Sequence, residues 1–181
     1  MTVTRIVTAA LLYTVLAVGA NAGTPQLPSA LTGMMVHDEP APALAAEFAG
    51  PDGTPMTTSD IDAPLTVLNF WATWCAPCVH EMPSLSALRD ASGEDFEVIT
   101  VATGHNTEAG LARFYERTGI TNLPTYRDAK QDLAREAAVL GLPVTLILDS
   151  EGREVARYQG DTDWADPDII EWLRAKAQLI N

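Results

Sequence analysis

Cys75 and Cys78 are the two cysteines of this 181-residue chain, and two residues separate them. A Cys-x-x-Cys pair can attach haem, bind a metal, form a structural disulfide or exchange electrons as a dithiol. Attachment of c-type haem requires a histidine directly after the second cysteine, and residue 79 is a valine. A zinc site needs two further ligands, and none of the three histidines forms a second paired motif. A purely structural disulfide across so short a loop adds little stability, which leaves the redox dithiol as the favoured interpretation.

The position of the pair supports redox chemistry. We expect a buried strand at 65–71 and a helix at about 76–91, so the cysteines lie where the helix begins. Residues three apart at a helix start share one face, within disulfide reach. The unpaired N–H groups of the first turn favour a thiolate at Cys75, and Cys78 is expected to be the more buried, resolving thiol. The two residues between them add no charge or side-chain donor, which favours a reducing pair.

The rest of the chain predicts alternating strands and helices. Asp52-Gly53 marks a tight turn, which indicates a small hairpin. Strands are expected at 97–102, 124–126, 144–149 and 154–159, and helices at 107–118, 130–139 and from Asp166-Pro167 onward. This alternation predicts an α/β fold with a central mixed β-sheet that helices cover on both faces.

The first 22 residues have the pattern of a secretory signal peptide. Arg5 is their only charged residue, Ile6 to Val18 is mostly apolar, and Ala20-Asn21-Ala22 resembles a cleavage site. Thirteen apolar residues are short for a bilayer, although an uncleaved membrane anchor is the alternative. Residues 23–41, rich in Ala and Pro, are expected to form a tether, and 42–181 the globular domain. Either version of the leader places that domain beyond the cytoplasm, where disulfides persist.

The charge balance restricts the partners. Eleven Lys and Arg stand against 24 Asp and Glu, which gives a formal net charge of −13. Such a surface repels nucleic acids and anionic membrane faces. We therefore expect no nucleic-acid partner.

Two stretches carry a resemblance to a known family. Residues 69–85 read NFWATWCAPCVHEMPSL, and residues 141–149 read GLPVTLILD. In this order and spacing they resemble the thioredoxin superfamily, and more narrowly the TlpA/ResA-like periplasmic thiol:disulfide oxidoreductases. The likeness extends over roughly residues 42–180. It implies a thioredoxin fold with an N-terminal β-hairpin and a central strand–helix insertion at 120–138.

The resemblance also implies roles for residues near the cysteines. Pro143 would be a cis proline that faces the pair, and the backbone of Leu142 would bind an extended substrate segment. Trp74 would shield the disulfide and shape the contact surface. Glu81, three residues after Cys78, would take the proton of that thiol. Thioredoxins proper carry a buried aspartate where this chain has Asn69, so Glu81 is the only nearby candidate base.

Together these features predict a periplasmic protein-disulfide reductase that works without a metal or other cofactor. Cys75 would attack a client disulfide, Cys78 would resolve the mixed disulfide, and a membrane thiol donor would reduce the pair again. The resemblance suggests apocytochrome c or a copper-carrying oxidase subunit as the client. The alternative is a copper metallochaperone that uses Cys75, Cys78 and His80. A thiol peroxidase is less favoured because Arg89 is the nearest arginine in sequence.

Overall fold

The structure, a computed structural model, describes residues 25–180 of the chain. The expected signal peptide or anchor at 1–22 lies outside these residues. Within the described part, no helix combines the length and the apolar character that crossing a membrane requires.

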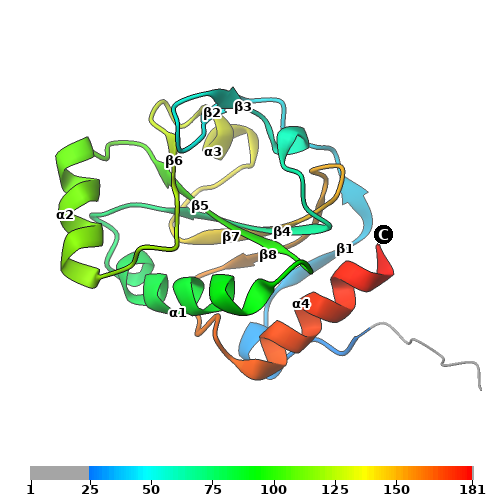
Figure 1. The fold of residues 1–181 in the computed structure, drawn as a ribbon. Helices are drawn as coiled ribbons and strands as arrows, with labels where there is room; N and C mark the ends of the chain where they lie inside the picture. Colours follow the sequence, from blue (N-terminus) through cyan, green and yellow to red (C-terminus); the bar gives the residue numbers. More distant parts are fainter. Residues whose placement is uncertain (1–24, 181) are drawn as a thin grey trace, which may run out of the picture.

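One mixed sheet forms the centre of the described chain, with the strand order β1-β8-β7-β4-β5-β6-β2-β3 (Figure 1). The parallel neighbours are β4, β5 and β6, and β7 runs antiparallel to β4. The strands are β1 (Met35–Ala41), β2 (Phe48–Ala49), β3 (Pro55–Met56), β4 (Leu65–Trp71), β5 (Glu97–Thr103), β6 (Thr125–Asp128), β7 (Val144–Asp149) and β8 (Glu154–Gln159). The helices are α1 (Ala76–Ser92), α2 (Glu108–Thr118), α3 (Asp132–Glu136) and α4 (Pro167–Leu179), with short 3-10 helices at Ser29–Leu31 and Thr58–Asp60.

Strand β4 lies at the middle of this sheet. All seven of its residues are buried, because β5 and β7 pair with its two edges and helices cover both of its faces. A continuous apolar run is the sequence pattern of such a strand, which explains why its bounds matched the prediction. The chain leaves β4 at Trp71 and enters α1 five residues later, so the sheet fixes where α1 begins.

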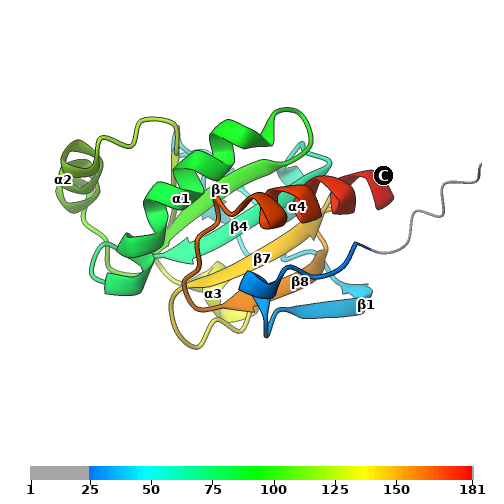
Figure 2. The same cartoon turned by 90° about the horizontal axis from the view of Figure 1, so that it is seen from below.

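The core divides into two layers, one on each face of the sheet. Figures 1 and 2 show α1 and α4 on one face and α3 on the other. On the first face, side chains of α1, α2 and α4 pack together with inward residues of β4 and β5, among them Leu85, Phe114 and Trp172. On the second face, Leu133 of α3 packs with Phe70 and its neighbours. The predicted mixed α/β fold with both faces covered is confirmed.

The stretch predicted to be a tether, 23–41, contains a strand of the sheet. β1 pairs antiparallel with β8, with Met35 opposite Arg157. Its side chains are exposed or half-buried, so the apolar alternation that would have predicted a strand is missing. Backbone pairing and one side-chain contact, from His37 Nε2 to Glu154 Oε1 at 2.6 Å, hold β1 at the edge. The expected domain start at residue 42 was therefore wrong for this strand.

The predicted hairpin and insertion are both present. β2 and β3 pair antiparallel around a turn in which Gly53 has a φ of +84°, and the Asp52 carboxylate accepts a hydrogen bond from the backbone of Thr54. β6 and α3 form the strand–helix insertion, which extends the sheet beyond β5. Helix α3 is shorter than the predicted 130–139, because Gln131 and Ala138 adopt left-handed backbone conformations that bound the helix.

Candidate active site

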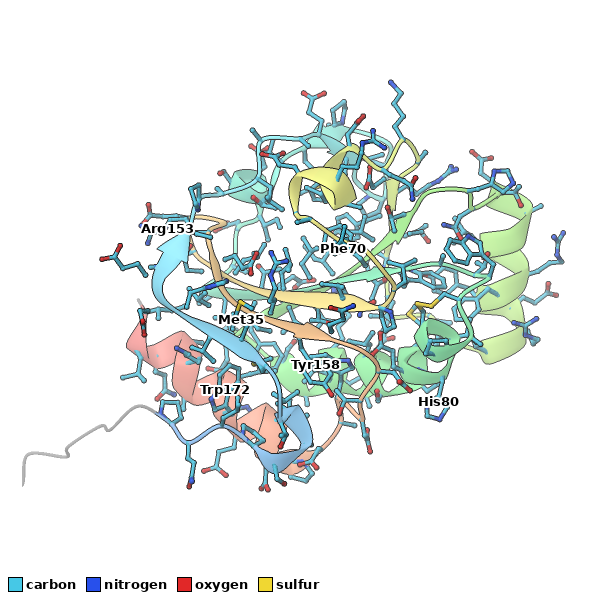
Figure 3. All side chains as sticks on the ribbon, turned by 180° about the vertical axis from the view of Figure 1, so that it is seen from behind. Met35, Phe70, His80, Arg153, Tyr158 and Trp172 are labelled. Carbon is cyan, nitrogen blue, oxygen red and sulfur yellow. A yellow bond between two sulfur atoms is a disulfide. The ribbon has the colours of Figure 1, made fainter. Side chains whose placement is uncertain are left out.

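The two cysteines form a disulfide at the N-terminal end of α1 (Figure 3). Their sulfur atoms lie 2.01 Å apart and their Cα atoms 5.3 Å apart. Cys75 is the N-cap residue of α1, and its Sγ accepts a hydrogen bond of 3.3 Å from the backbone N–H of Cys78. Cys75 is 6% exposed and Cys78 is fully buried. The predicted difference between a more accessible and a more buried cysteine is therefore present.

The local electrostatics favour a negative charge on Cys75 once the disulfide is reduced. The N-terminal end of a helix carries a partial positive charge, and the first turn of α1 holds no acidic side chain that would oppose it. The backbone N–H of Cys78 already points at the sulfur. Together these features stabilise a thiolate, which is the nucleophilic form of cysteine.

Side chains of the loop after β5 hold the segment that precedes Cys75. The Asn106 Oδ1 atom accepts hydrogen bonds from the backbone N–H and the hydroxyl of Thr73, at 2.9 and 3.0 Å. The Trp74 indole donates to the backbone carbonyl of His105, and the residue, next to Cys75 in the sequence, is 62% exposed. Sequence reasoning singled out Trp74 but missed Asn106. The parallel pairing of β4 and β5, which brings their carboxyl ends together, was the signal that could have found it.

The bond between Leu142 and Pro143 is cis, as the resemblance implied. These residues precede β7, in which Val144 pairs with Phe70 of β4. In this antiparallel register Pro143 lies at the level of Trp71, at the end of β4 from which the cysteine loop emerges. Leu142 is half-buried and Leu140 is 97% exposed, so apolar side chains border this end of the sheet.

Glu81 lies inside the protein, with an exposed fraction of 1%. Its Oε1 accepts a hydrogen bond of 2.8 Å from Asn69 Nδ2, and its Oε2 accepts one of 2.9 Å from the indole of Trp164. Burial raises the pKa of Glu81 to about 7, and the nearby charge of Asp161 acts in the same direction, while hydrogen bonds from Trp164, Asn69 and the backbone of Thr162 oppose the rise. A carboxyl group with this pKa exchanges protons readily at neutral pH.

Two residues around Glu81 escaped the sequence analysis. Trp164 comes from the segment between β8 and α4, 83 residues away, and is fully buried. Thr145 of β7 lies opposite Asn69 of β4, and its hydroxyl accepts the second N–H of that amide at 2.9 Å. Asn69 was recognised only as a departure from thioredoxins. The β4–β7 register could have suggested Thr145, whereas no local pattern marked Trp164.

His80 points away from the disulfide region into solvent (Figure 3). Its side chain is 83% exposed, and its Nδ1 lies 3.1 Å from a carboxylate oxygen of Asp161. Among residues 25–180, no group of three or more His, Cys, Asp or Glu side chains could hold a metal ion. The copper alternative therefore gains no support from a described cluster of ligands.

Comparisons with known proteins agree with this geometry. Residues 37–171 match the Redoxin family. The thiol:disulfide interchange protein HelX of Rhodobacter capsulatus is 32% identical over 138 residues, which cover 74% of this chain and 71% of HelX. The thiol-disulfide oxidoreductase ResA of Bacillus thuringiensis is 27% identical over 61% of this chain and 63% of ResA.

Solved structures show the same architecture. The exposed lipoprotein thioredoxin Etrx1 of Streptococcus pneumoniae has a TM-score of 0.61 and 27% identity, over 74% of this chain and 98% of that one. A thiol:disulfide interchange protein DsbE from Chlorobium tepidum has a TM-score of 0.62 and 23% identity, over 77% and 95% of the two chains, and supports the fold alone. From the Redoxin match, the relatives and the Cys75–Cys78 disulfide, we conclude that this chain belongs to the Redoxin family and is a thiol:disulfide oxidoreductase with the thioredoxin fold.

Proposed function

We propose that the protein reduces disulfides in client proteins and that Glu81 is the base of the reaction. The observation that carries the proposal is the combination of the Cys75–Cys78 disulfide at a helix start with a buried carboxyl group three residues further along α1. Cys75 is at the N-cap, where a thiolate is stabilised, and the pKa of Glu81 is raised by burial to about 7.

The reaction begins from the reduced dithiol. The Cys75 thiolate attacks one sulfur of the client disulfide, which forms a mixed disulfide and expels the other client sulfur as a thiolate. Glu81 then takes the proton of the Cys78 thiol. The Cys78 thiolate attacks the Cys75 sulfur, the Cys75–Cys78 bond forms, and the second client sulfur leaves as a thiolate. The client has gained two electrons, which a dithiol donor restores to the pair.

The end of the sheet around Cys75 suits an extended client segment. The exposed Trp74 ring and the loop from Leu140 to Pro143 border the disulfide region, and Leu142 offers backbone groups for pairing with a peptide. We infer that these residues bind the client. The sequence of residues 1–22 supports a location outside the cytoplasm, in the periplasm, where a membrane protein would supply the dithiol donor.

The names of the relatives support the reaction class and leave the client open. HelX and ResA are named for disulfide interchange and thiol–disulfide oxidoreduction. From the family resemblance we propose a client that needs reduced cysteines to receive its cofactor, such as apocytochrome c or a copper-carrying oxidase subunit. Cysteine must be a thiolate to bind a metal or react with a haem group, so a reductase is required before either step.

Insulin reduction, with dithiothreitol as the electron donor, tests the activity. We expect the unmodified chain to accelerate precipitation of the insulin B chain, Cys75→Ser to abolish the acceleration, and Cys78→Ser to accumulate a mixed disulfide. Ser150→Ala, in the turn directly after β7, is the matched control and keeps full activity. A reduced protein that binds Cu(I) tightly and reduces no disulfide would overturn the proposal in favour of the metallochaperone that uses Cys75, Cys78 and His80.

A further inference from the structure

Asn69 lies where its side-chain amide can form a hydrogen bond with Glu81 in either protonation state of the carboxyl group. It lies in the middle of β4 and is fully buried. Its Nδ2 donates two hydrogen bonds, one to Glu81 Oε1 at 2.8 Å and one to Thr145 Oγ1 at 2.9 Å. Its Oδ1 is also buried, but it has no hydrogen-bond partner within the part of the chain that the structure describes. A buried acceptor without a partner is costly, so its presence beside a titrating group requires a reason.

The hydrogen bonds around Glu81 match its ionised form. Both carboxylate oxygens accept, Oε1 from Asn69 and Oε2 from the indole of Trp164. A protonated carboxyl group must instead donate through one of its oxygens. The Trp164 indole is a donor only, so it cannot accept that proton and keeps Oε2 as an acceptor. The carbonyl oxygen of an acid is a better acceptor than its hydroxyl oxygen, so the indole favours a proton on Oε1, the oxygen that faces Asn69.

We propose that Asn69 is a positioning residue whose amide turns about χ2 as Glu81 gains or loses its proton. Beside the carboxylate, Nδ2 donates to Oε1, as the structure shows. Beside the acid, half a turn brings Oδ1 toward Glu81, where it accepts from the O–H on Oε1. The unpartnered Oδ1 of the ionised state thus becomes the acceptor of the protonated state, and Nδ2 moves to the position that Oδ1 held. The Thr145 hydroxyl can donate or accept, so it keeps a bond to the amide in both orientations.

This inference rests on the proposed function, because it concerns the proton that Glu81 takes from Cys78. Only a proton moves: it leaves the Cys78 sulfur, binds Glu81 Oε1, and later leaves for water or a client thiolate. The turning amide gives each state of Glu81 a hydrogen-bonded partner, so the proton can arrive and depart without leaving Glu81 unpaired. A fixed amide would favour the ionised state alone and so hold Glu81 as a weaker base.

The charged groups near Glu81 are few among the described residues. Asp161, in the segment after β8, raises the pKa of Glu81 and pairs with the exposed His80. On the neighbouring strands, Asn69 of β4 contacts Glu81 and Thr145 of β7 contacts Asn69, and both side chains are uncharged. On α1 itself, Cys78 does not titrate while the disulfide is closed, and the exposed His80 pairs with Asp161. The oxidised protein therefore removes the Cys78 thiol from the titration of Glu81.

Nuclear magnetic resonance of the oxidised full chain tests the proposal. The ¹³C signal of the Glu81 carboxyl group and the ¹H and ¹⁵N signals of the Asn69 side-chain amide are followed from about pH 5 to about pH 9. We expect both to change with one midpoint near pH 7, the pKa of Glu81. Above it, one Asn69 amide proton carries the downfield shift of a bond to a carboxylate, and below it neither does. An Asn69 amide whose hydrogen-bonded proton keeps its shift throughout the Glu81 titration would overturn the proposal.

Glu81→Gln gives a second and independent measurement. Trp164 requires an acceptor, so the new side-chain amide must present its oxygen to the indole and its NH₂ group to Asn69. Asn69 must then present Oδ1, as beside the acid, and its amide signals are expected to match the low-pH spectrum of the unmodified chain at every pH. Signals that match the high-pH spectrum instead would contradict the turn. Failure of the proposal that Glu81 is the base is a separate outcome, since it would appear as full disulfide-reducing activity of this variant.

Discussion

The Glu81 carboxyl group is buried, and both of its oxygens accept hydrogen bonds. The raised pKa, about 7, means that the ionised base forms as the pH rises through neutrality. Because the base form takes the proton of Cys78, resolution of the mixed disulfide should accelerate with pH and level off above about pH 7. Glu81→Gln removes this base, so we expect resolution to slow about 100-fold near neutral pH. The increase of the rate with pH should also disappear. Stopped-flow tryptophan fluorescence of the mixed disulfide measures the step.

Two results would contradict this assignment. The first is a Glu81→Gln variant that resolves the mixed disulfide at the rate of the unmodified chain. The second is a Glu81→Gln variant whose resolution rate depends on pH as in the unmodified chain, which would assign the titration to another group, such as Cys75 itself. Glu136→Gln is the matched control, since Glu136 contacts backbone N–H groups of residues 45 and 46, remote from the cysteines in the fold. We expect its pH profile to follow that of the unmodified chain.

The same carboxyl group makes stability depend on pH. Its pKa is about 7 in the folded chain against the ordinary value of 4.5, so between these values the folded state binds a proton that the unfolded state has lost. Glu81 therefore lowers the free energy of unfolding as the pH rises through this window, by on the order of 3 kcal/mol in all. Urea unfolding of the unmodified chain and Glu81→Gln at pH 5 and pH 8 measures it. The difference between them should change with pH in this direction, and a constant difference would contradict the prediction.

Elements set by local pattern were predictable, and contacts between distant elements were not. The apolar run of β4 and the cysteine at the start of α1 are visible within a dozen residues, so the site could be located from sequence. The exposed strand β1 has no apolar alternation, because it lies at the sheet edge. Trp164 reaches Glu81 across 83 residues of sequence. Neither strand β1 nor the contact of Trp164 with Glu81 follows from the spacing of residues in the sequence, since each depends on how the complete sheet and its helices pack.

Strand β1 is joined to the sheet by a charged cluster on β8. Glu154 is 4% exposed and contacts His37 of β1 and Arg157 of its own strand. Burial raises the pKa of Glu154, but the hydrogen bonds from Arg157 and His37 outweigh it and hold that pKa below its usual value. Arg157→Met leaves the buried carboxylate without its main partner, so we expect a loss of about 3 kcal/mol in the free energy of unfolding.

Urea unfolding at neutral pH measures this loss, and two further variants serve as comparisons. The double variant Glu154→Leu/Arg157→Met removes both charges and should recover most of the stability. Arg135→Met breaks an exposed i,i+3 pair with Asp132 and should cost less than about 1 kcal/mol. Equal losses for Arg157→Met and Arg135→Met would show that Glu154 needs no buried partner.

Over the surface of residues 25–180, few large apolar side chains are exposed, and two of them lie within three residues of Cys75 or Pro143 in the sequence. Trp74 is 62% exposed and Leu140 is 97% exposed. A protein client would cover them on docking, whereas a small disulfide would not. Leu140→Ser should therefore lower kcat/KM for insulin about threefold to tenfold, and lower it less for a small aromatic disulfide, because it removes burial of about one apolar side chain. Equal losses on both substrates would place Leu140 outside the client surface.

The formal net charge of −13 acts at longer range than any of these contacts. A molecule with this charge attracts basic clients and repels acidic ones, and dissolved salt screens both effects. We therefore expect kcat/KM for a disulfide-bridged peptide rich in lysine to fall about tenfold as the ionic strength rises from about 10 mM to about 150 mM. A peptide of the same length rich in glutamate should show the opposite trend, and Cys75→Ser should turn over neither. Parallel salt dependence for the two peptides would mean that charges near Cys75, rather than the net charge, control encounter with the client.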